Sequence, residues 1–471
     1  MTSQNVVLVR GLGLTAAMSV NIANMIGTGV FLKARVMTCN VGTPGLMIAA
    51  WAVAGLLSLA GALTYAELTT MMPRAGGEYV FIREAYGRRW AFLFGWTQFL
   101  MARTAAQAAL AVGFAIFLNI LAGGALTDAF ITVHLFGFAV PFGPLQAVAL
   151  GAIALTTLIN CGAVALGGGV ASVLTFVKVA LVLAIGAGAL WLAPGQWGHF
   201  ALANDGGACE GVSQAARGGL AGFGAAMLGA LWAYDGWNNV APLAGEVHDP
   251  QRTLPRAFFG GMAIVGVLYV VANVAYIYVL SPVEIANLPA SSSVATAVAR
   301  RFMGAAAVTL VAAALLTSSF GALHTSVLAS ARFPFAMAGD GLFFRSLSQI
   351  SPRTRVPVRA VIAQGVWSGM LALSGSYDML TDSAIFALWL FYGLATASVF
   401  VFRRRFPDAP RPYRTWGYPI VPAIFVIVTG WLLVNTLITA PTQTVIGLGL
   451  IALGLPVYAY WARRGIGPTK P

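Results

Sequence analysis

Long runs of apolar residues recur along this chain of 471 residues, and they limit its fold more than any other feature. Each run approaches the ~20 residues that an α-helix needs to cross the ~30 Å hydrocarbon core of a bilayer. Only 9% of the residues are charged, whereas about a quarter are charged in an ordinary soluble protein. The sequence therefore predicts an all-α integral membrane protein.

About twelve spans can be placed, and the loops between them are too short to form a soluble domain. The predicted spans are residues 12–36, 44–72, 89–120, 144–163, 170–193, 219–246, 257–280, 303–333, 357–375, 382–402, 419–438 and 442–461. The first span is too long, and too closely followed by others, to be a cleaved signal peptide. We expect a single polytopic membrane domain over residues 1–471.

The net charge of +13 suggests nucleic-acid binding at first sight, but the distribution of the charges argues against it. With the N-terminus placed inside, the inner loops and tails hold roughly 20 of the 27 Lys and Arg residues, and the outer loops hold about five. This asymmetry follows the positive-inside rule and predicts that both termini are cytoplasmic. The expected surroundings are the lipid bilayer, with no nucleic-acid partner.

The cysteine and histidine residues do not indicate a metal site, a cofactor or an enzyme. No cysteine pair has metal-ligand spacing, and none of the four histidines belongs to a zinc-enzyme motif. Cys39 and Cys209 both fall in predicted outer loops, so the sequence is compatible with a disulfide or with two free thiols. We expect no metal and no cofactor, and no cluster of catalytic groups is visible.

Two spans are interrupted by glycine at matching positions. The first span breaks at residues 26–29 (IGTG) and the sixth at residues 234–239 (YDGWNN). They lie five spans apart, so equivalent helices of a five-helix repeat would run in opposite directions, and such paired breaks indicate a transporter site. Glycine also serves close helix packing in membranes. The pairing favours a binding pocket, because unwound backbone in hydrocarbon must face protein or water.

Such breaks can bind both ends of a zwitterionic amino acid. The free N–H groups and positive dipole end at residues 28–30 suit a carboxylate. The carbonyl groups that end the first half of span six, near residues 231–233, suit an ammonium group. Trp232 would then either cover a bound side chain as a gate or pack at an interface.

Charged residues inside spans are functional candidates. Asp235 lies ~15 residues into its span, roughly 22 Å deep at 1.5 Å per residue, and Arg103 is also deep. The two could form a structural ion pair or contact a substrate. Glu67 and Glu246 lie close to inner helix ends, where we expect interfacial positions.

Lys178 is the third deep charge, ~8 residues into the fifth span. Its long side chain could extend to the cytoplasmic interface. Alternatively it could occupy the place of a coupling cation, donating to carbonyl groups of span one and to Ser318 or Ser319, and exchange a proton during transport.

Short motifs follow one another in a fixed order along nearly the whole chain. They are MIGTGVF at 25–31, PRAGGEY at 73–79, RTAAQ at 103–107, WAYDGWN at 232–238, AGE at 244–246, AR at 331–332, DGL at 340–342, RPYR at 411–414 and GYP at 417–419. They resemble the amino acid–polyamine–organocation superfamily, in particular the L-type amino acid transporters and their bacterial relatives. The resemblance implies a LeuT-type fold with alternating access: five-helix inverted repeats at 12–193 and 219–402, broken helices 1 and 6, and two additional helices at 419–461.

The resemblance also implies roles for the residues at the breaks. Taken with the reasoning on the breaks, it gives a predicted substrate site of Met25, Ile26, Gly27, Thr28, Gly29, Trp232, Ala233 and Asp235. Its carboxylate position matches residues 27–29, its amine position matches the carbonyl groups around residues 25, 26 and 232, and Trp232 matches the aromatic gate. Lys178 matches a lysine that replaces sodium in sodium-independent relatives. Arg103 matches an arginine common in this branch.

The function implied is sodium-independent exchange of amino acids across a plasma membrane, in the bacterial inner membrane. Proton-coupled symport of amino acids and transport of polyamines or other amines are the alternatives. Animal members join a glycoprotein subunit through a cysteine in the loop after helix three. Residues 121–143 contain no cysteine, so we expect no covalent heavy-chain subunit.

Two positions depart from the family pattern. Ala23 stands where many members have glycine, which alters the helix beneath the site. Asp235 stands where carriers of large neutral substrates have glycine, and this resembles members that also accept cationic amino acids.

Overall fold

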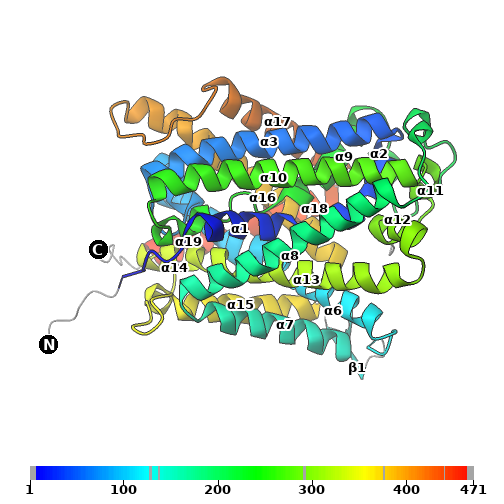
Figure 1. Ribbon diagram of the computed structural model, residues 1–471. Coiled ribbons are helices and arrows are strands. Elements are labelled where there is room, and N and C mark those ends of the chain that lie inside the picture. Colours follow the sequence, from blue (N-terminus) through cyan, green and yellow to red (C-terminus); the bar gives the residue numbers. More distant parts are fainter. Residues whose placement is uncertain are drawn as a thin grey trace.

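The computed structural model of the protein describes residues 7–126, 130–135, 138–289, 293–374, 377–439 and 441–463. Its long helices run side by side through one bundle (Figure 1). By length and composition, seven helical segments within these described ranges could cross a membrane, or eight when one bent helix pair is counted as a span. The prediction of an all-α membrane fold is therefore confirmed.

Several predicted spans correspond to one helix each. These are α3 (Pro44–Met71), α7 (Pro144–Asn160), α8 (Val164–Trp191), α10 (Pro250–Val279), α15 (Val358–Ser374), α16 (Tyr377–Arg405) and α17 (Ile420–Thr439). The helices α3, α7 and α10 begin with proline, whose fixed φ and missing N–H suit the first position of a helix.

Other spans are built from consecutive pieces. They are α1 (Leu14–Met25) with α2 (Gly29–Val41); α5 (Arg88–Thr97), a π-helical turn η1 (Gln98–Ala102) and α6 (Arg103–Leu121); α13 (Ala306–Ser330) with α14 (Arg332–Gly339); and α18 (Pro441–Ala452) with α19 (Gly454–Arg463). The remaining helices are α4 (Glu78–Tyr86), α9 (Gly219–Tyr234), α11 (Pro282–Ala286) and α12 (Val294–Met303).

The sixth span differs most from its prediction. Helix α9 ends at Tyr234, and the chain continues through turns into a 3-10 helix, η4 (Ala241–Glu246), instead of a second α-helical half. Gly236 has φ +105°, a conformation that only glycine adopts without strain, so the helix cannot continue through it. The backbone groups of this segment need partners from neighbouring elements.

The end of the first span also differs from its prediction. Helix α2 continues to Val41, so Cys39 lies in its last turn and not in a loop. Cys39 and Cys209 form a disulfide with Cα atoms 5.6 Å apart, which answers the question that the sequence left open. The bridge fixes the end of α2 to the segment that precedes α9.

A two-stranded hairpin in the loop after α6 is an addition to the all-α prediction. Strand β1 (Ile131–Leu135) pairs antiparallel with β2 (Phe138–Phe142), with Ile131 opposite Phe142. Both strands are short and rich in β-branched and aromatic residues, which favour strands over helices outside the spans.

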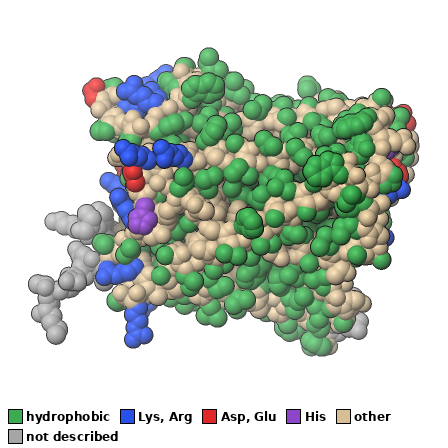
Figure 2. Space-filling model, viewed as in Figure 1, with side chains coloured by type: hydrophobic (Ala, Val, Ile, Leu, Met, Phe, Trp, Pro, Cys, Tyr) green, Lys and Arg blue, Asp and Glu red, His purple; other side chains and the backbone are tan. Residues whose placement is uncertain are grey.

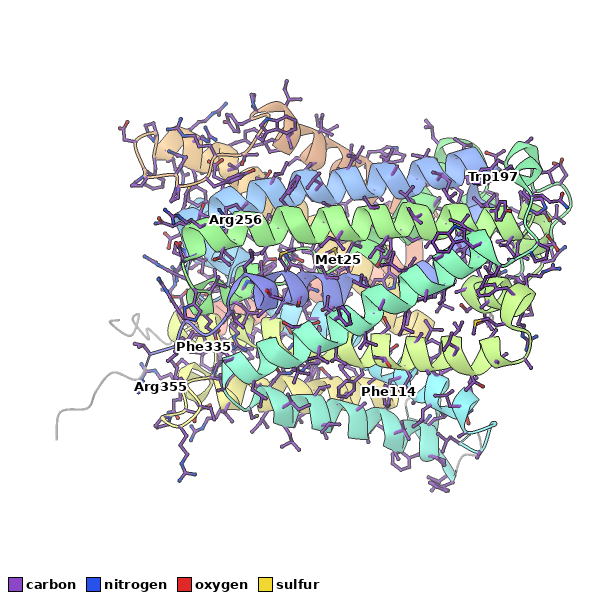
Figure 3. All side chains as sticks on the ribbon, in the orientation of Figure 1. Met25, Phe114, Trp197, Arg256, Phe335 and Arg355 are labelled. Carbon is purple, nitrogen blue, oxygen red and sulfur yellow. A yellow bond between two sulfur atoms is a disulfide. The ribbon has the colours of Figure 1, made fainter. Side chains whose placement is uncertain are left out.

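The surface is divided along the bundle axis. Hydrophobic side chains cover its middle, and Lys and Arg side chains gather at one end (Figure 2). Arg256 and Arg355 lie at this basic end, whereas Trp197 lies at the opposite end (Figure 3). An apolar belt with basic residues concentrated on one side is the pattern of a membrane protein that follows the positive-inside rule.

Buried ion pairs hold the basic end together. Glu246 and Arg332 are both fully buried and lie 2.7 Å apart. Glu67 is fully buried as well and accepts two hydrogen bonds from Arg403, at 2.8 and 2.9 Å. Glu67 and Glu246, expected at the inner interface, thus lie inside the protein at this end, paired with neighbouring arginines.

The chain before α1 joins the same end. The N–H groups of Gly11 and Leu12 donate to the carbonyl oxygen of Glu246, at 2.9 and 3.0 Å. The N–H of His248 in turn donates to the carbonyl of Leu12. These bonds attach the segment before α1 to the end of the sixth span.

Replacing Arg332 with alanine should destabilise the protein by about 3–5 kcal/mol, because Glu246 would remain buried without its partner. The matched control is Arg301→Ala, since Arg301 pairs with Glu284 at 2.6 Å while both side chains stay about half exposed. That change should cost at most about 1 kcal/mol. Thermal unfolding of both variants in detergent makes the comparison, and equal losses would contradict it.

Candidate functional site

The first helix break lies near the middle of the bundle, where Figure 3 places Met25. Helix α1 ends at Met25 and α2 begins at Gly29, with a 41° bend between them. The N–H of Gly27 folds back onto the carbonyl of Met25, at 2.7 Å. The first-turn N–H groups of α2, at Gly29 and Val30, have no acceptor within the helix. Together with the helix dipole they form a site for an anion.

The second break packs directly against the first. A Cβ atom on Gly29 would lie 2.5 Å from the Cβ of Ala233 and 2.7 Å from its Cα. Only glycine at position 29 permits this approach. The side chain of Asn24 also donates to the carbonyl of Asp235, at 3.3 Å, and that of Asn21 accepts from the N–H of Val240, at 2.9 Å. The two unwound segments therefore form one structural unit.

Tyr269 on α10 joins the same unit and was missed in the sequence. Its hydroxyl lies 2.5 Å from the carbonyl oxygen of Met25 and 2.9 Å from that of Ala233. Its one hydroxyl hydrogen is therefore shared between carbonyl oxygens at both breaks. A tyrosine in the middle of an apolar span gives no local signal of this role.

A small cavity lies between the breaks. It is lined by Asn24, Met25, Gly27, Thr28, Gly29, Arg103, Ala106, Leu110, Trp232, Asp235 and Ser326. Most residues of the predicted substrate site are in this lining, but Ile26 and Ala233 are not. The cavity volume is about 30 Å³, room for roughly two water molecules. An amino acid would fit only after the lining moves.

The carbonyl groups at the breaks are not equally available to an ammonium group. A carbonyl oxygen has two lone pairs. Met25 uses both, accepting from Tyr269 and Gly27, and Ile26 uses both as well. Ala233 accepts from Tyr269, and Trp232 accepts from the N–H of Asp235 at 3.2 Å. The carbonyl oxygens of Ala233 and Trp232 can therefore each accept one more hydrogen bond.

Lys178 lies on the other side of α1 and is buried, 1% exposed. Its ammonium nitrogen donates to the carbonyl groups of Ala23 and Ile26, the latter at 2.9 Å. The alternative in which it extends to the membrane interface was therefore wrong.

The two predicted neighbours of Lys178 differ in their contacts. Ser318 on α13 donates to the carbonyl groups of Ile26 and Gly27, at 2.6 and 3.1 Å. The hydroxyl of Ser319 is buried without a partner in the described part of the chain. Lys178 and Ser318 thus share one carbonyl, whereas Ser319 makes no such bond.

Arg103 and Asp235 form a buried ion pair beside the cavity. The Nη1 atom of Arg103 lies 3.0 Å from Oδ2 of Asp235. The hydroxyl of Tyr392 on α16 donates to Oδ1 of Asp235, at 2.6 Å, and accepts from Nη2 of Arg103, at 2.7 Å. Both carboxylate oxygens of Asp235 are thus occupied. Arg103 follows the π-helical turn η1 directly, a distortion that often marks functional sites.

Known proteins with similar sequences point in one direction. A family model described as amino acid permease matches residues 12–458. The serine/threonine exchanger of Bacillus subtilis is 32% identical over 97% of this chain and 98% of its own. The human large neutral amino acids transporter small subunit 2 is 30% identical over 98% of this chain and 82% of its own. The human cystine/glutamate transporter is 30% identical over 97% and 86%.

Gly29→Ala should disturb the packing of the two breaks, because the added methyl group meets backbone atoms of Ala233 that cannot rotate away. We expect a loss of stability of about 1–3 kcal/mol from this overpacking. Gly45→Ala on α3 is the control, since its added Cβ meets nothing within 4 Å. Melting temperatures of the two purified variants test the contact. A Gly29→Ala protein as stable as Gly45→Ala would contradict the close packing.

Proposed function

The chain belongs to the amino acid permease family, and on that premise we propose that it exchanges amino acids across a membrane without sodium. The observation that carries the proposal is the cavity between two facing helix breaks. It offers Gly29, whose N–H has no acceptor within α2, on one side, and Trp232, whose carbonyl group can accept one more hydrogen bond, on the other. This is the arrangement that a zwitterion needs, and no charged side chain is used.

The roles follow from the contacts. The substrate carboxylate binds the first break at Gly27, Thr28 and Gly29, where the N–H of Gly29 has no acceptor within α2. The ammonium group binds the carbonyl groups of Trp232 and Ala233, because those of Met25 and Ile26 are already saturated. The side chain of Trp232 lines the cavity and acts as the gate over the bound substrate.

Lys178 takes the place of a coupling cation. Its ammonium group and the hydroxyl of Ser318 together satisfy the carbonyl groups at the end of α1. A metal ion is not needed there, which supports sodium-independent transport. Ser319 has no contact that supports the same role.

Small neutral amino acids are the favoured substrates. Asp235 is neutralised by Arg103 and hydrogen-bonded by Tyr392, so a cationic side chain would have to displace both. The cavity is also small and partly lined by Ala106 and Leu110. A relative named as a serine/threonine exchanger fits this substrate class.

The membrane arrangement is part of the proposal. The five-helix repeats are residues 12–193 and 219–402, with additional helices at 419–461. The basic end faces the cytoplasm of a bacterial inner membrane, with both termini on that side. One relative is named a small subunit. The absence of cysteine from residues 121–143 supports a carrier without a covalent heavy chain, and the protein is not an enzyme.

The function is tested with purified protein in liposomes loaded with one unlabelled amino acid at a time. Labelled serine or alanine should enter loaded vesicles at least about tenfold faster than empty ones, because exchange requires a substrate on both sides. Entry into empty vesicles driven by an inward proton gradient would point to symport instead. No entry of any amino acid, with entry of polyamines, would overturn the proposal.

Lys178→Ala should reduce the initial exchange rate by about tenfold or more, since losing a hydrogen-bonded charge costs about 1.5–3 kcal/mol. Membrane insertion should remain near that of the wild type. Lys33→Ala is the control, because Lys33 lies on α2 away from the cavity lining. Normal exchange by well-expressed Lys178→Ala protein would remove the proposed role of this lysine.

A further inference from the structure

Glu78 is a buried acid that the proposed transport mechanism does not use. It is the first residue of α4, the short helix between α3 and α5, and it is 1% exposed. Gly76 and Gly77, with φ +107° and +44°, turn the chain into the bundle just before it. A Cβ on Gly77 would lie 2.7 Å from backbone atoms of Ala241 and Pro242. The start of α4 therefore packs closely against the backbone of the segment that follows the second break.

Side chains connect Glu78 to the cavity. The amide nitrogen of Asn238 donates to Oε1 of Glu78, and the amide oxygen of Asn238 accepts from Nη2 of Arg103, at 3.3 Å. Arg103 continues the connection to Asp235, and both residues line the cavity. The second carboxylate oxygen of Glu78, Oε2, is buried and has no hydrogen-bond partner among the described residues.

The charges around Glu78 do not balance when it is ionised. The titratable and charged groups that face it are Arg103 from α6, Asp235 from the second break, Tyr65 from α3 and Tyr392 from α16. The guanidinium group of Arg103 would then have to balance two buried carboxylates, those of Glu78 and Asp235. A buried charge that is not fully balanced by an opposite charge costs free energy. Burial raises the pKa of Glu78 to about 7, although Arg103 and the hydrogen bond from Asn238 lower it.

We infer that Glu78 is a proton-binding site and that its protonation accelerates the movement of amino acids through the adjacent cavity. A proton from solvent binds Oε2, and the carboxylate becomes a neutral carboxyl group. Asn238 then donates to a weaker acceptor, because hydrogen bonds to ionised groups are roughly twice as strong as neutral ones. The second break is then held less tightly to α4, and Asp235 is the one carboxylate whose charge Arg103 still has to balance. This inference rests on the proposed exchange function.

The test compares exchange of labelled alanine for internal alanine at equal internal and external pH, between pH 5.5 and 8.5. A group with a pKa of about 7 is mostly protonated at pH 6 and mostly ionised at pH 8. The wild-type rate should therefore fall by about tenfold from pH 6 to pH 8. Glu78→Gln, which carries a neutral side chain at every pH, should exchange at the wild-type pH 6 rate throughout. Glu84→Gln, an exposed change on the same helix, should keep the wild-type profile.

Two results would overturn the inference: a pH-independent wild-type rate, or a Glu78→Gln profile that still follows the wild type. Wild-type protein that exchanges no amino acid at any pH would instead defeat the proposed function, so the two failures are distinct. Infrared difference spectra of the wild type provide a second readout that does not need the variant to fold. They should show a carboxyl band that titrates near pH 7, and its absence would also overturn the inference.

Discussion

Every backbone N–H and C=O group inside a membrane must find a partner within the protein, and the site depends on how this chain meets that requirement. Two spans give up their helical hydrogen bonds near the middle of the bundle. Side chains from other helices then satisfy the freed groups: Tyr269 at both breaks, and Lys178 with Ser318 at the end of α1. The first-turn N–H groups of α2 keep no acceptor within their own helix, and Gly29, the first residue of α2, lines the cavity.

Because side chains must satisfy the backbone groups freed at the breaks, a binding site for a neutral molecule is surrounded by many buried polar side chains. Tyr269, Lys178 and Ser318 brace the carbonyl groups of the breaks with a hydroxyl or a charge, and none of the three lines the cavity. Arg103 and Asp235, in contrast, do line it. Since they are paired with each other and with Tyr392, they present little net charge to a ligand.

The sequence predicts the positions of the spans and breaks well, but it does not predict which distant side chains contact one another. Apolar length identifies the spans, and glycine with Asp235 identifies the breaks, because both are local properties of the chain. Glu78 and Tyr269 were missed because their roles depend on contacts with residues 160 and 244 positions away. The partner of Glu246 was missed for the same reason, since only the fold brings Arg332 to it. The non-helical end of span six follows from Gly236, but hydropathy alone cannot distinguish it from a helix.

The bonds also indicate which parts can move together. Tyr269 ties both breaks to α10, and Asn24 ties α1 to Asp235, so the two breaks and α10 form one body. Other helices contact this body from the opposite side, through Lys178 on α8, Ser318 on α13 and Arg103 on α6. Opening the cavity by relative motion must stretch these charged contacts, whose separation in a low-dielectric interior is costly. A proton on Glu78 would weaken the attachment of the second break to α4, and so lower the cost of the motion that an amino acid requires.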